Sequence, residues 1–472
     1  MKYKTIELSH TNEIIQTYGV NSLMAKVIES KKIDQKQFKS FMDPHLIYHD
    51  FSLFEEADET LERIEEAIAN KEKICIYGDY DCDGILATTI LVQAFHERGV
   101  EVGYHIPNRF TDGYGLNTTR VEQMAEKGYS LIITVDNGIK AFDAVEKAGE
   151  LGIDVIITDH HAFDGEVPVA YSIIHTKMSP KYPFKEICGG FIAYKLAAAL
   201  LKHHDPYLFT LASITTISDM MPLLDENRSL VRRGLQFMKQ YKYPSLELLK
   251  GSRDYDVTTI GFTIAPRINA FGRLPELVNP VYLVKYFLKE AAPAYLEKIS
   301  NYASKINSKR QSLTTSLYKE AVTDTSSPCL FYGSENMHEG LVGLVAGKYT
   351  REYEQPAFVM HYNPKEEIYK GSARGIDGFN IYNFFTHHED LFVQYGGHAK
   401  AGGFTITKSN YPLVYDALMN DIKGCHFEAS ESVIPITLTD TTIPNVESLD
   451  LLAPFGEENK APLFILEDVS CH

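Results

Sequence analysis

The stretch at residues 74–86, ICIYGDYDCDGIL, decides the fold of the chain around it. An apolar, β-prone run comes first, and Asp79, Asp81 and Asp83 then follow at a spacing of two residues before Gly84. Residues two apart on an extended chain point to the same side, so we expect the three carboxylates to face one spot. Such groups repel one another unless a cation lies between them. The stretch therefore predicts a strand, a divalent-metal site and then a helix.

Strand and helix patterns alternate on both sides of this stretch. Apolar residues recur at helical spacing in residues 58–70, 84–98, 119–127 and 141–151. Short apolar runs predict strands at residues 74–77, 100–106, 131–135 and 154–158. Alternation of this kind is typical of an α/β fold in which helices cover both faces of a parallel sheet.

Polar residues follow the ends of these predicted strands. Asp136 ends one apolar run, the pair His160 and His161 follows another, and Asp219 follows a predicted helix at residues 206–217. Ligands of open parallel sheets bind beyond the carboxyl ends of the strands. Carboxylate and imidazole ligands without a thiolate suit Mn²⁺ or Mg²⁺ better than structural zinc. The predicted metal ligands are Asp81, Asp83, Asp136, His160 and Asp219, and one bridging carboxylate would allow two ions.

Other interpretations of these residues stay open. Any single aspartate after a strand could instead cap the next helix. Asp79 and Asp159 could orient neighbouring ligands rather than bind metal. His160 and His161 would point apart on an extended chain, so one could bind metal while the other faces a substrate; a pair of surface histidines is the alternative.

The rest of the chain divides into five predicted segments. Residues 1–50 are helical, residues 51–255 form the catalytic α/β domain, and residues 256–325 hold an Arg/Gly loop at 263–274 and a long helix at 291–324. Residues 326–425 form a smaller α/β domain, with a glycine-dense turn at 395–403. Residues 426–472 have strand character but too few strands for a domain.

Composition and charge limit the possible functions. The 472-residue chain has a formal net charge of −17, so a nucleic-acid substrate requires a local basic track. No apolar run reaches the roughly 18–20 residues that a membrane span needs. The N-terminus has no secretory signal pattern. The six cysteines make no C-x-x-C pair, and this pattern fits a reducing cytoplasm.

Arginines and glycine turns are the candidate phosphate contacts. A guanidinium group binds phosphate oxygens in a bidentate manner, and the glycine-flanked contexts GSARG and AFGRL favour this role over a solvated surface. Gly396, Gly397 and His398 offer backbone N–H groups and an imidazole, although a turn between strands explains them equally well. The candidate arginines are Arg109, Arg267, Arg273 and Arg374.

These residues carry a resemblance to a known family. YGDYDCDG, TVDNG, TDHH and SDMMPL, in that order, resemble the four motifs of the DHH phosphoesterase superfamily. PNRFTDGYGLN, PRINAFGRL, HEGLVGLVAG, GSARG and GGHAKAGG are similar to the bacterial RecJ exonucleases, which degrade single-stranded DNA from the 5′ end. The resemblance extends over roughly residues 15–470 and implies a DHH domain joined by a long helix to a DHHA1 domain, with a short C-terminal β tail.

The resemblance also implies roles for particular residues. The five predicted ligands would hold two Mn²⁺ or Mg²⁺ ions, with Asp136 as the bridging ligand and Asp79 in a supporting role. His161 would face the scissile phosphate. Ser372, Arg374 and His398 would grip DNA phosphate in a cleft between the domains, with Arg109 reaching from the catalytic side.

The function implied is a two-metal 5′→3′ exonuclease that hydrolyses single-stranded DNA to mononucleotides in DNA repair and recombination. Its partners would be single-stranded DNA and a single-strand-binding protein or a helicase, without a membrane. Two rivals remain: a DHH phosphodiesterase on dinucleotides or short RNA, and a noncatalytic replication scaffold. Two departures from the family pattern stand out: Tyr77 occupies a position where some relatives have histidine, and the tail resembles the shortened opening of an OB-fold.

Overall fold

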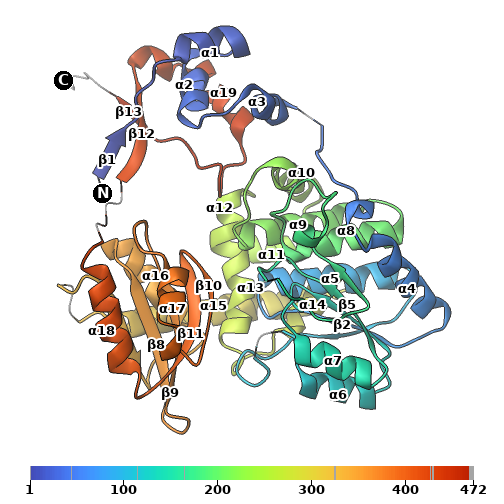
Figure 1. The fold of residues 1–472 in the computed structure, drawn as a ribbon. Coiled ribbons are helices and arrows are strands. Elements are labelled where there is room, and N and C mark those ends of the chain that lie inside the picture. Colours follow the sequence, from blue (N-terminus) through green and yellow to red (C-terminus); the bar gives the residue numbers. More distant parts are fainter. Residues whose placement is uncertain are drawn as a thin grey trace. The chain divides into compact units, whose positions relative to one another are not determined.

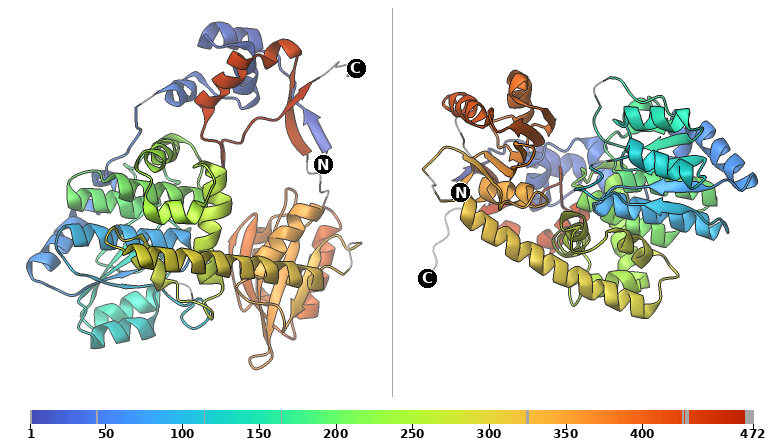
Figure 2. Two further views of the ribbon diagram at one scale, coloured as in Figure 1. Left: turned by 180° about the vertical axis from the view of Figure 1, so that it is seen from behind. Right: turned by 90° about the horizontal axis from the view of Figure 1, so that it is seen from below.

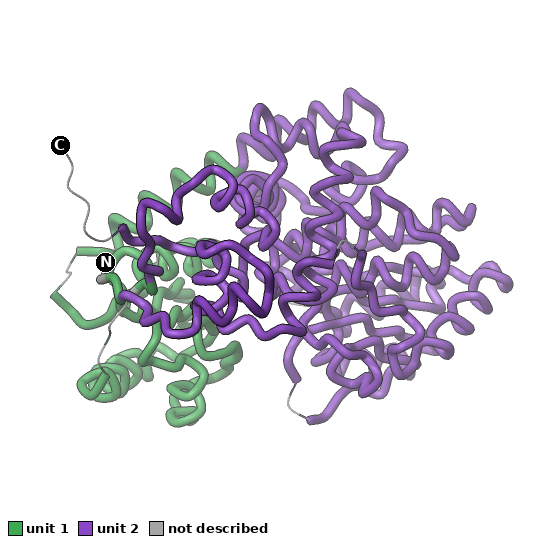
Figure 3. Tube along the Cα trace, turned by 90° about the horizontal axis from the view of Figure 1, so that it is seen from above, with its two compact units in different colours: residues 1–4, 307–432 green, residues 5–306, 433–472 purple. Residues whose placement is uncertain are grey.

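The computed structural model describes residues 2–43, 45–113, 115–163, 165–323, 326–425, 427 and 430–466. The chain forms two compact units, drawn in different colours in Figure 3. The smaller unit contains residues 1–4 and 307–432, and the larger contains residues 5–306 and 433–472. The last six residues of the predicted β tail, 467–472, lie outside the described part of the chain.

The larger unit is built on a five-stranded, fully parallel sheet with the strand order β3-β2-β4-β5-β6. The middle strands β2, β4 and β5 are continuous apolar runs because helices cover both faces of the sheet (Figure 1). The predicted α/β fold with a parallel sheet is confirmed. The strands are β2 (Ile74–Tyr77), β3 (Gly103–His105), β4 (Leu131–Val135), β5 (Asp154–Thr158) and β6 (Ser172–Ile174).

Helices connect these strands and extend the unit. One buried helix, α5, packs against α8, α9 and α14, which explains why its residues are apolar on every side. The helices of the unit are α4 (Ala57–Ala69), α5 (Cys82–Glu97), α6 (Thr118–Glu126), α7 (Phe142–Glu150), α8 (Gly189–Leu201), α9 (Pro206–Ser218), α10 (Asp225–Tyr241), α11 (Pro244–Lys250) and α14 (Val281–Phe287).

The segment predicted as an Arg/Gly loop is helical, so that prediction is wrong. It forms α12 (Val257–Thr259), a turn of π-helix η3 (Ile260–Ile264) and α13 (Ala265–Arg273). Ile264, Ile268 and Phe271 are buried at helical spacing, and Pro266 lies in the first turn, where a missing N–H leaves no bond unmade. The predicted long helix is confirmed as α15 (Pro293–Ala321), shown from behind in the left panel of Figure 2.

The smaller unit contains a five-stranded sheet with the order β10-β11-β9-β8-β7. Only the β7–β8 pair is parallel. The predicted glycine-dense turn is instead a hairpin, in which only Ala399 and Lys400 separate two strands. The strands are β7 (Leu330–Ser334), β8 (Ala357–Asn363), β9 (Ile368–Arg374), β10 (Gln394–His398) and β11 (Ala401–Thr407), and the helices are α16 (Val342–Tyr353), α17 (Ile381–His387) and α18 (Tyr411–Ile422).

The two ends of the chain share one small hydrophobic core, and their ribbons lie together in Figure 1. Leu23, Val27 and Ile28 of α2 (Ser22–Ser30) pack with Ile436 and Leu452. The neighbouring elements are α1 (Thr11–Tyr18), α3 (Gln35–Met42), α19 (Ile443–Ser448) and the sheet of β1 (Lys2–Thr5), β12 (Ser430–Ile436) and β13 (Phe464–Leu466). The predicted short C-terminal β tail is thus present, and its core partners come from the N-terminus.

None of the described helices combines the length and the apolar character needed to cross a bilayer.

We expect Leu452→Ala to lower the free energy of unfolding of this terminal core by about 2–5 kcal/mol, because it leaves a cavity at a fully buried position. Leu451→Ala is the matched control. Its side chain is 49% exposed, and its truncation should change stability by less than about 0.5 kcal/mol. Chemical denaturation measures both. Equal effects of the two variants would contradict the shared core.

Candidate metal centre

The aspartates of the opening stretch lie where β2 ends and α5 begins. The strand ends at Tyr77 and the helix starts at Cys82, so Asp83 lies in the first turn of a helix. The prediction that strand alternation aims all three carboxylates at one spot is therefore wrong. The structure divides them between two groups of candidate ligands.

The first group consists of Asp79, Asp81 and Asp136, whose ligand atoms lie within 4.8 Å of one another. Asp81 is also the N-cap of α5, because its Oδ1 accepts a hydrogen bond from the Gly84 N–H at 3.1 Å. Asp81 thus caps α5 and at the same time belongs to this group of candidate metal ligands. A Cβ at Gly84 would lie 2.5 Å from the backbone nitrogen of Asp79, so only glycine allows this close turn.

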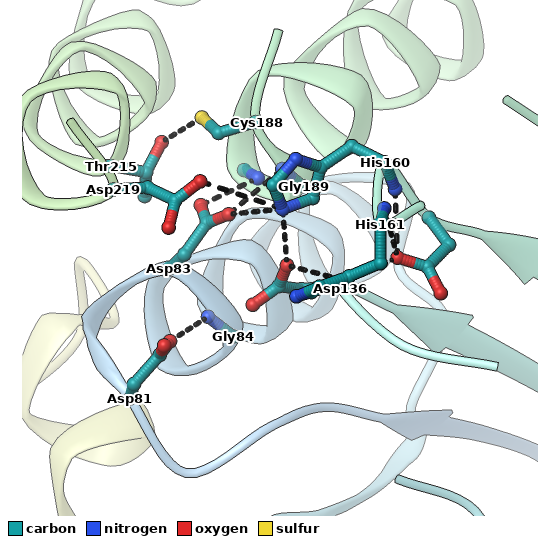
Figure 4. A network of polar contacts seen from close by, with 12 residues as sticks. Asp81, Asp83, Gly84, Asp136, His160, His161, Cys188, Gly189, Thr215 and Asp219 are labelled. Atoms are coloured by element: carbon teal, nitrogen blue, oxygen red, sulfur yellow. Dashed lines mark hydrogen bonds and ion pairs between the residues drawn. The ribbon is translucent and has the colours of Figure 1, made fainter. Parts of the chain in front are cut away.

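The second group consists of Asp83, His160 and Asp219. Figure 4 shows the carboxylates of Asp83 and Asp219 directed at the imidazole of His160. His160 Nε2 lies 3.1 Å from Asp136 Oδ1, 3.5 Å from Asp219 Oδ2 and 3.7 Å from Asp83 Oδ2. His160 therefore belongs to the second group while it contacts Asp136 of the first.

Asp83 is held by the N-terminus of α8. Its two carboxylate oxygens accept hydrogen bonds from the backbone N–H groups of Gly189 and Gly190, both at 2.8 Å. Free N–H groups and the helix dipole make this end favourable for a negative charge. The sequence interpretation did not include this interaction, although the glycine pair at positions 189 and 190, ahead of an apolar run, was a signal for it.

Asp136 lies between the two groups. Its backbone has φ +62°, a left-handed conformation that is uncommon for a residue with a side chain. Strain of this kind persists where the surroundings impose it, often at functional sites. A Cβ at Gly189 would lie 2.5 Å from Asp136 Cβ, so α8 fits closely against this aspartate.

The two adjacent histidines do not point apart, contrary to the prediction. Their ring centroids are 4.5 Å apart, because Asp159 Oδ1 accepts the backbone N–H groups of both His160 and His161 and turns the chain. The same oxygen lies 2.7 Å from His161 Nδ1. Burial opposes a charged imidazole, but this bond to Asp159 outweighs it and raises the pKa of His161 to about 9. Asp159 thus orients His161.

A further histidine, His175 at the end of β6, supports the same turn. It is fully buried. Its Nδ1 accepts the backbone N–H of Lys177 at 3.1 Å, so its Nε2 carries the proton and donates to the His161 carbonyl at 3.0 Å. The sequence interpretation missed His175 because the contact depends on the pairing of β5 with β6.

The electrostatics of the centre fit bound cations. Burial, strengthened by repulsion between the carboxylates, raises the pKa of Asp79, Asp83, Asp136 and Asp219. Burial lowers the pKa of His160 to about 4. Asp79 Oδ1, Asp219 Oδ2 and His160 Nε2 are buried without a hydrogen-bond partner among the described residues. Buried oxygen and imidazole donors of this kind are the ligands that Mn²⁺ and Mg²⁺ use.

Tyr77 lies beside the centre but is turned away from its ligands. The ring is fully buried and packs at 5.1 Å from His105, and its hydroxyl donates to the Gly115 carbonyl at 3.2 Å. It thus anchors the loop after β3.

The predicted arginines of the larger unit lie in two places. Arg109 lies over the Tyr80 ring at 5.2 Å, and the charges of Arg109 and Arg273 both act on the Tyr80 hydroxyl. These two cations therefore flank the aspartate loop. Arg267 instead donates to the Leu249 carbonyl at the end of α11.

The predicted phosphate contacts of the smaller unit lie on neighbouring strands. Arg374 Nη1 donates to Ser372 Oγ at 2.7 Å. Ala401 pairs with Arg374 on one side and with His398 on the other, so these side chains belong to one end of the sheet. Gly396 and Gly397 precede His398 on β10, and Gly397 has φ +136°, which favours glycine.

Two models of known protein families match this chain. The family model for the DHH family, N-terminal domain, matches residues 73–218, and that for the DHHA1 domain matches residues 326–424. The single-stranded-DNA-specific exonuclease RecJ of Salmonella typhimurium is 30% identical over 75% of this chain and 67% of its own length. The chain belongs to the RecJ family.

Other RecJ proteins are also similar to this chain over most of its length. The Bacillus subtilis protein is 35% identical over 87% of this chain, which spans 54% of that relative's length. A crystal structure of RecJ from Thermus thermophilus in complex with Mn²⁺ matches 98% of this chain and 69% of its own, with a TM-score of 0.85 and 26% identity. A further structure of exonuclease RecJ bound to manganese matches with a TM-score of 0.68 and 27% identity over 81% of this chain.

We expect Gly189→Ala to weaken Mn²⁺ binding by about 10–100-fold, because the new methyl group displaces Asp136 and the α8 N–H groups that hold Asp83. Gly149→Ala is the control, since a Cβ there meets no atom within 4 Å. Isothermal titration with Mn²⁺ measures the affinities. Unchanged affinity in Gly189→Ala would contradict the role given to this contact.

Proposed function

We propose that the chain is a metal-dependent exonuclease that hydrolyses single-stranded DNA from the 5′ end to mononucleotides, in DNA repair and recombination. One observation carries the proposal: two groups of buried and partly buried carboxylate and imidazole donors meet at Asp136. Family membership supports it, since the curated relatives are named single-stranded-DNA-specific exonucleases.

The residues that would hold the metal are Asp79, Asp81 and Asp136 for one ion and Asp83, His160 and Asp219 for the other. The contact between Asp136 and His160 favours Asp136 as the residue shared by both sites. Two such ions, Mn²⁺ or Mg²⁺, would activate water and neutralise charge on the phosphate oxygens. Asp79 thus moves from a supporting role to that of a proposed ligand.

The side chains around the centre would orient the substrate. Asp159 orients His161 through Nδ1, and the His161 side chain, which is 41% exposed, would face the scissile phosphate. Arg109 and Arg273 flank Tyr80 and would bind the phosphate oxygens of the strand. Arg267, already bound to a carbonyl, would contribute by holding α13 in place.

The smaller unit would bind a phosphate through Arg374, Ser372 and His398. Arg374 Nη2 faces the start of α16, where a Cβ at Gly343 would lie 3.0 Å from it. Glycine therefore leaves room beside the guanidinium, and backbone N–H groups from Gly396 and Gly397 would add donors. A single-strand-binding protein or a helicase as partner, and a cytoplasmic location, stay predictions.

A comparison of three substrates tests the proposal: 5′-labelled single-stranded DNA, the matching duplex and a dinucleotide, each with Mn²⁺. We expect labelled mononucleotides from the single strand alone. Cleavage of the dinucleotide alone would instead identify a phosphodiesterase of very short substrates, and no cleavage of any substrate would identify a noncatalytic protein.

We expect Asp136→Asn to lower the hydrolysis rate by at least about 100-fold in Mn²⁺. The amide keeps the shape that packs against Gly189 but removes a charge. Without metal, the variant should be more stable than the parent protein, because a buried repulsive carboxylate is gone. Mn²⁺ should raise its thermal midpoint less than that of the parent. Normal turnover by Asp136→Asn would contradict the metal assignment.

A further inference from the structure

Tyrosine and lysine alternate along one face of α15. Tyr295, Lys298, Tyr302 and Lys305 are spaced by three, four and three residues, which places them in a single stripe along the helix. The adjacent stripe of Leu296, Ile299, Ala303 and Ile306 is buried against the larger unit. Burial of that neighbouring stripe and exposure of Lys298, Tyr302 and Lys305 define the outward face of this part of α15.

Three residues of this stripe, Tyr295, Lys298 and Tyr302, line one wall of a cavity of about 530 Å³, which is within the range of small-ligand sites. The opposite wall is the segment between α13 and α14 together with Tyr282. Tyr282 is 50% exposed and Tyr302 is 44% exposed, although their rings could have packed against the protein. Half-exposed rings on both walls are therefore available to a ligand.

The chemistry of the walls favours a nucleic-acid strand. Lys285 Nζ lies 5.3 Å from the centre of the Tyr295 ring, and exposed Lys298 and Lys305 lie between and beyond the tyrosines of the stripe. Among the described lining residues Lys298 is the one cation and Glu276 the one acidic residue, while Lys285 and Lys305 lie outside the lining. Aromatic rings that alternate with cations are the features by which proteins bind single strands without reading sequence, since bases stack and phosphates pair with lysine.

The cavity lining follows directly in sequence on the end of α13, which packs against the aspartate loop. The lining begins at Pro275, three residues after Gly272, where a Cβ would lie 2.1 Å from the Tyr80 carbonyl oxygen. The protein has a net charge of −17, so a single strand needs a local path of cations and rings between acidic surfaces.

We propose that Tyr282, Tyr302 and Lys298 bind the part of a single DNA strand that lies outside the metal centre. This inference rests on the proposed exonuclease function and adds a binding track to it. The track would hold the unreacted length of the strand through stacking on the two tyrosines and a phosphate contact to Lys298. The track would raise the affinity for long strands and would not change the hydrolysis of the first nucleotides at the metal centre.

The test measures the affinity of the protein for 3′-labelled oligothymidylates of about 20 and about 4 nucleotides. Binding is detected by fluorescence anisotropy, and EDTA is present so that no strand is cut. Tyr302→Ala should weaken binding of the long strand at least about fivefold, the lower end for loss of one stacked base. Lys298→Gln should reduce the slope of log affinity against log salt by about 0.7, the value for one phosphate contact on a single strand. Binding of the short strand should be unchanged in both variants.

Matched controls come from α10. Tyr241 is 48% exposed and Lys239 is exposed, so Tyr241→Ala and Lys239→Gln remove similar groups away from the cavity and should bind both strands as the parent protein does. Thermal midpoints confirm that each variant is folded.

Three results separate the proposals. If Tyr302→Ala and Lys298→Gln keep the affinity and the salt slope of the parent protein, the proposed DNA-binding track is wrong. This surface would then be assigned to a protein partner. An equal loss for both strand lengths would also overturn the track, since the effect would then lie at the metal centre. If the parent protein binds long strands through the track but cuts no single strand in Mn²⁺, the exonuclease function fails while the track stands.

Discussion

Repulsion among closely spaced carboxylates is the constraint on which the larger unit of this protein depends. Asp79, Asp83 and Asp136 are buried beside the partly exposed Asp219, and burial with mutual repulsion raises the pKa of each. Such an arrangement is unfavourable in the absence of positive charge. The fold supplies part of that charge through the N-terminus of α8, which donates two N–H groups to Asp83, and bound divalent ions would supply the rest.

The surrounding structure holds these ligands in positions that the chain would otherwise avoid. Gly84 and Gly189 allow backbone and side chain to approach Asp79 and Asp136 more closely than any Cβ would permit. Asp136 itself keeps a left-handed backbone. Asp159 and His175 fix the turn that carries His160 and His161. These supporting residues set the geometry in advance, so little rearrangement is needed when ions and substrate bind.

Much of the fold and the centre could be predicted because each signal was local. Buried parallel strands read as continuous apolar runs, and polar residues after β2, β4 and β5 mark one edge of a sheet. The errors have local causes too. The strand at Tyr77 ends four residues before Asp81, so its alternation does not reach the aspartates. The Arg/Gly segment looked like a loop, yet its buried Ile268 and Phe271 show that packing outweighed the glycines.

The sequence by itself determined four of the five strands of the parallel sheet, the polar residues that follow three of them and the chemical type of the ligands, since these follow from residue type and spacing; β6 was not predicted. Only the tertiary structure decided which carboxylates share a site, because Asp83 and Asp219 meet through the packing of α5 against α9. It also decided that Gly189 and His175 support the centre, and that the two ends of the chain share one core. Contacts of this kind join residues far apart in sequence, and no local pattern encodes them.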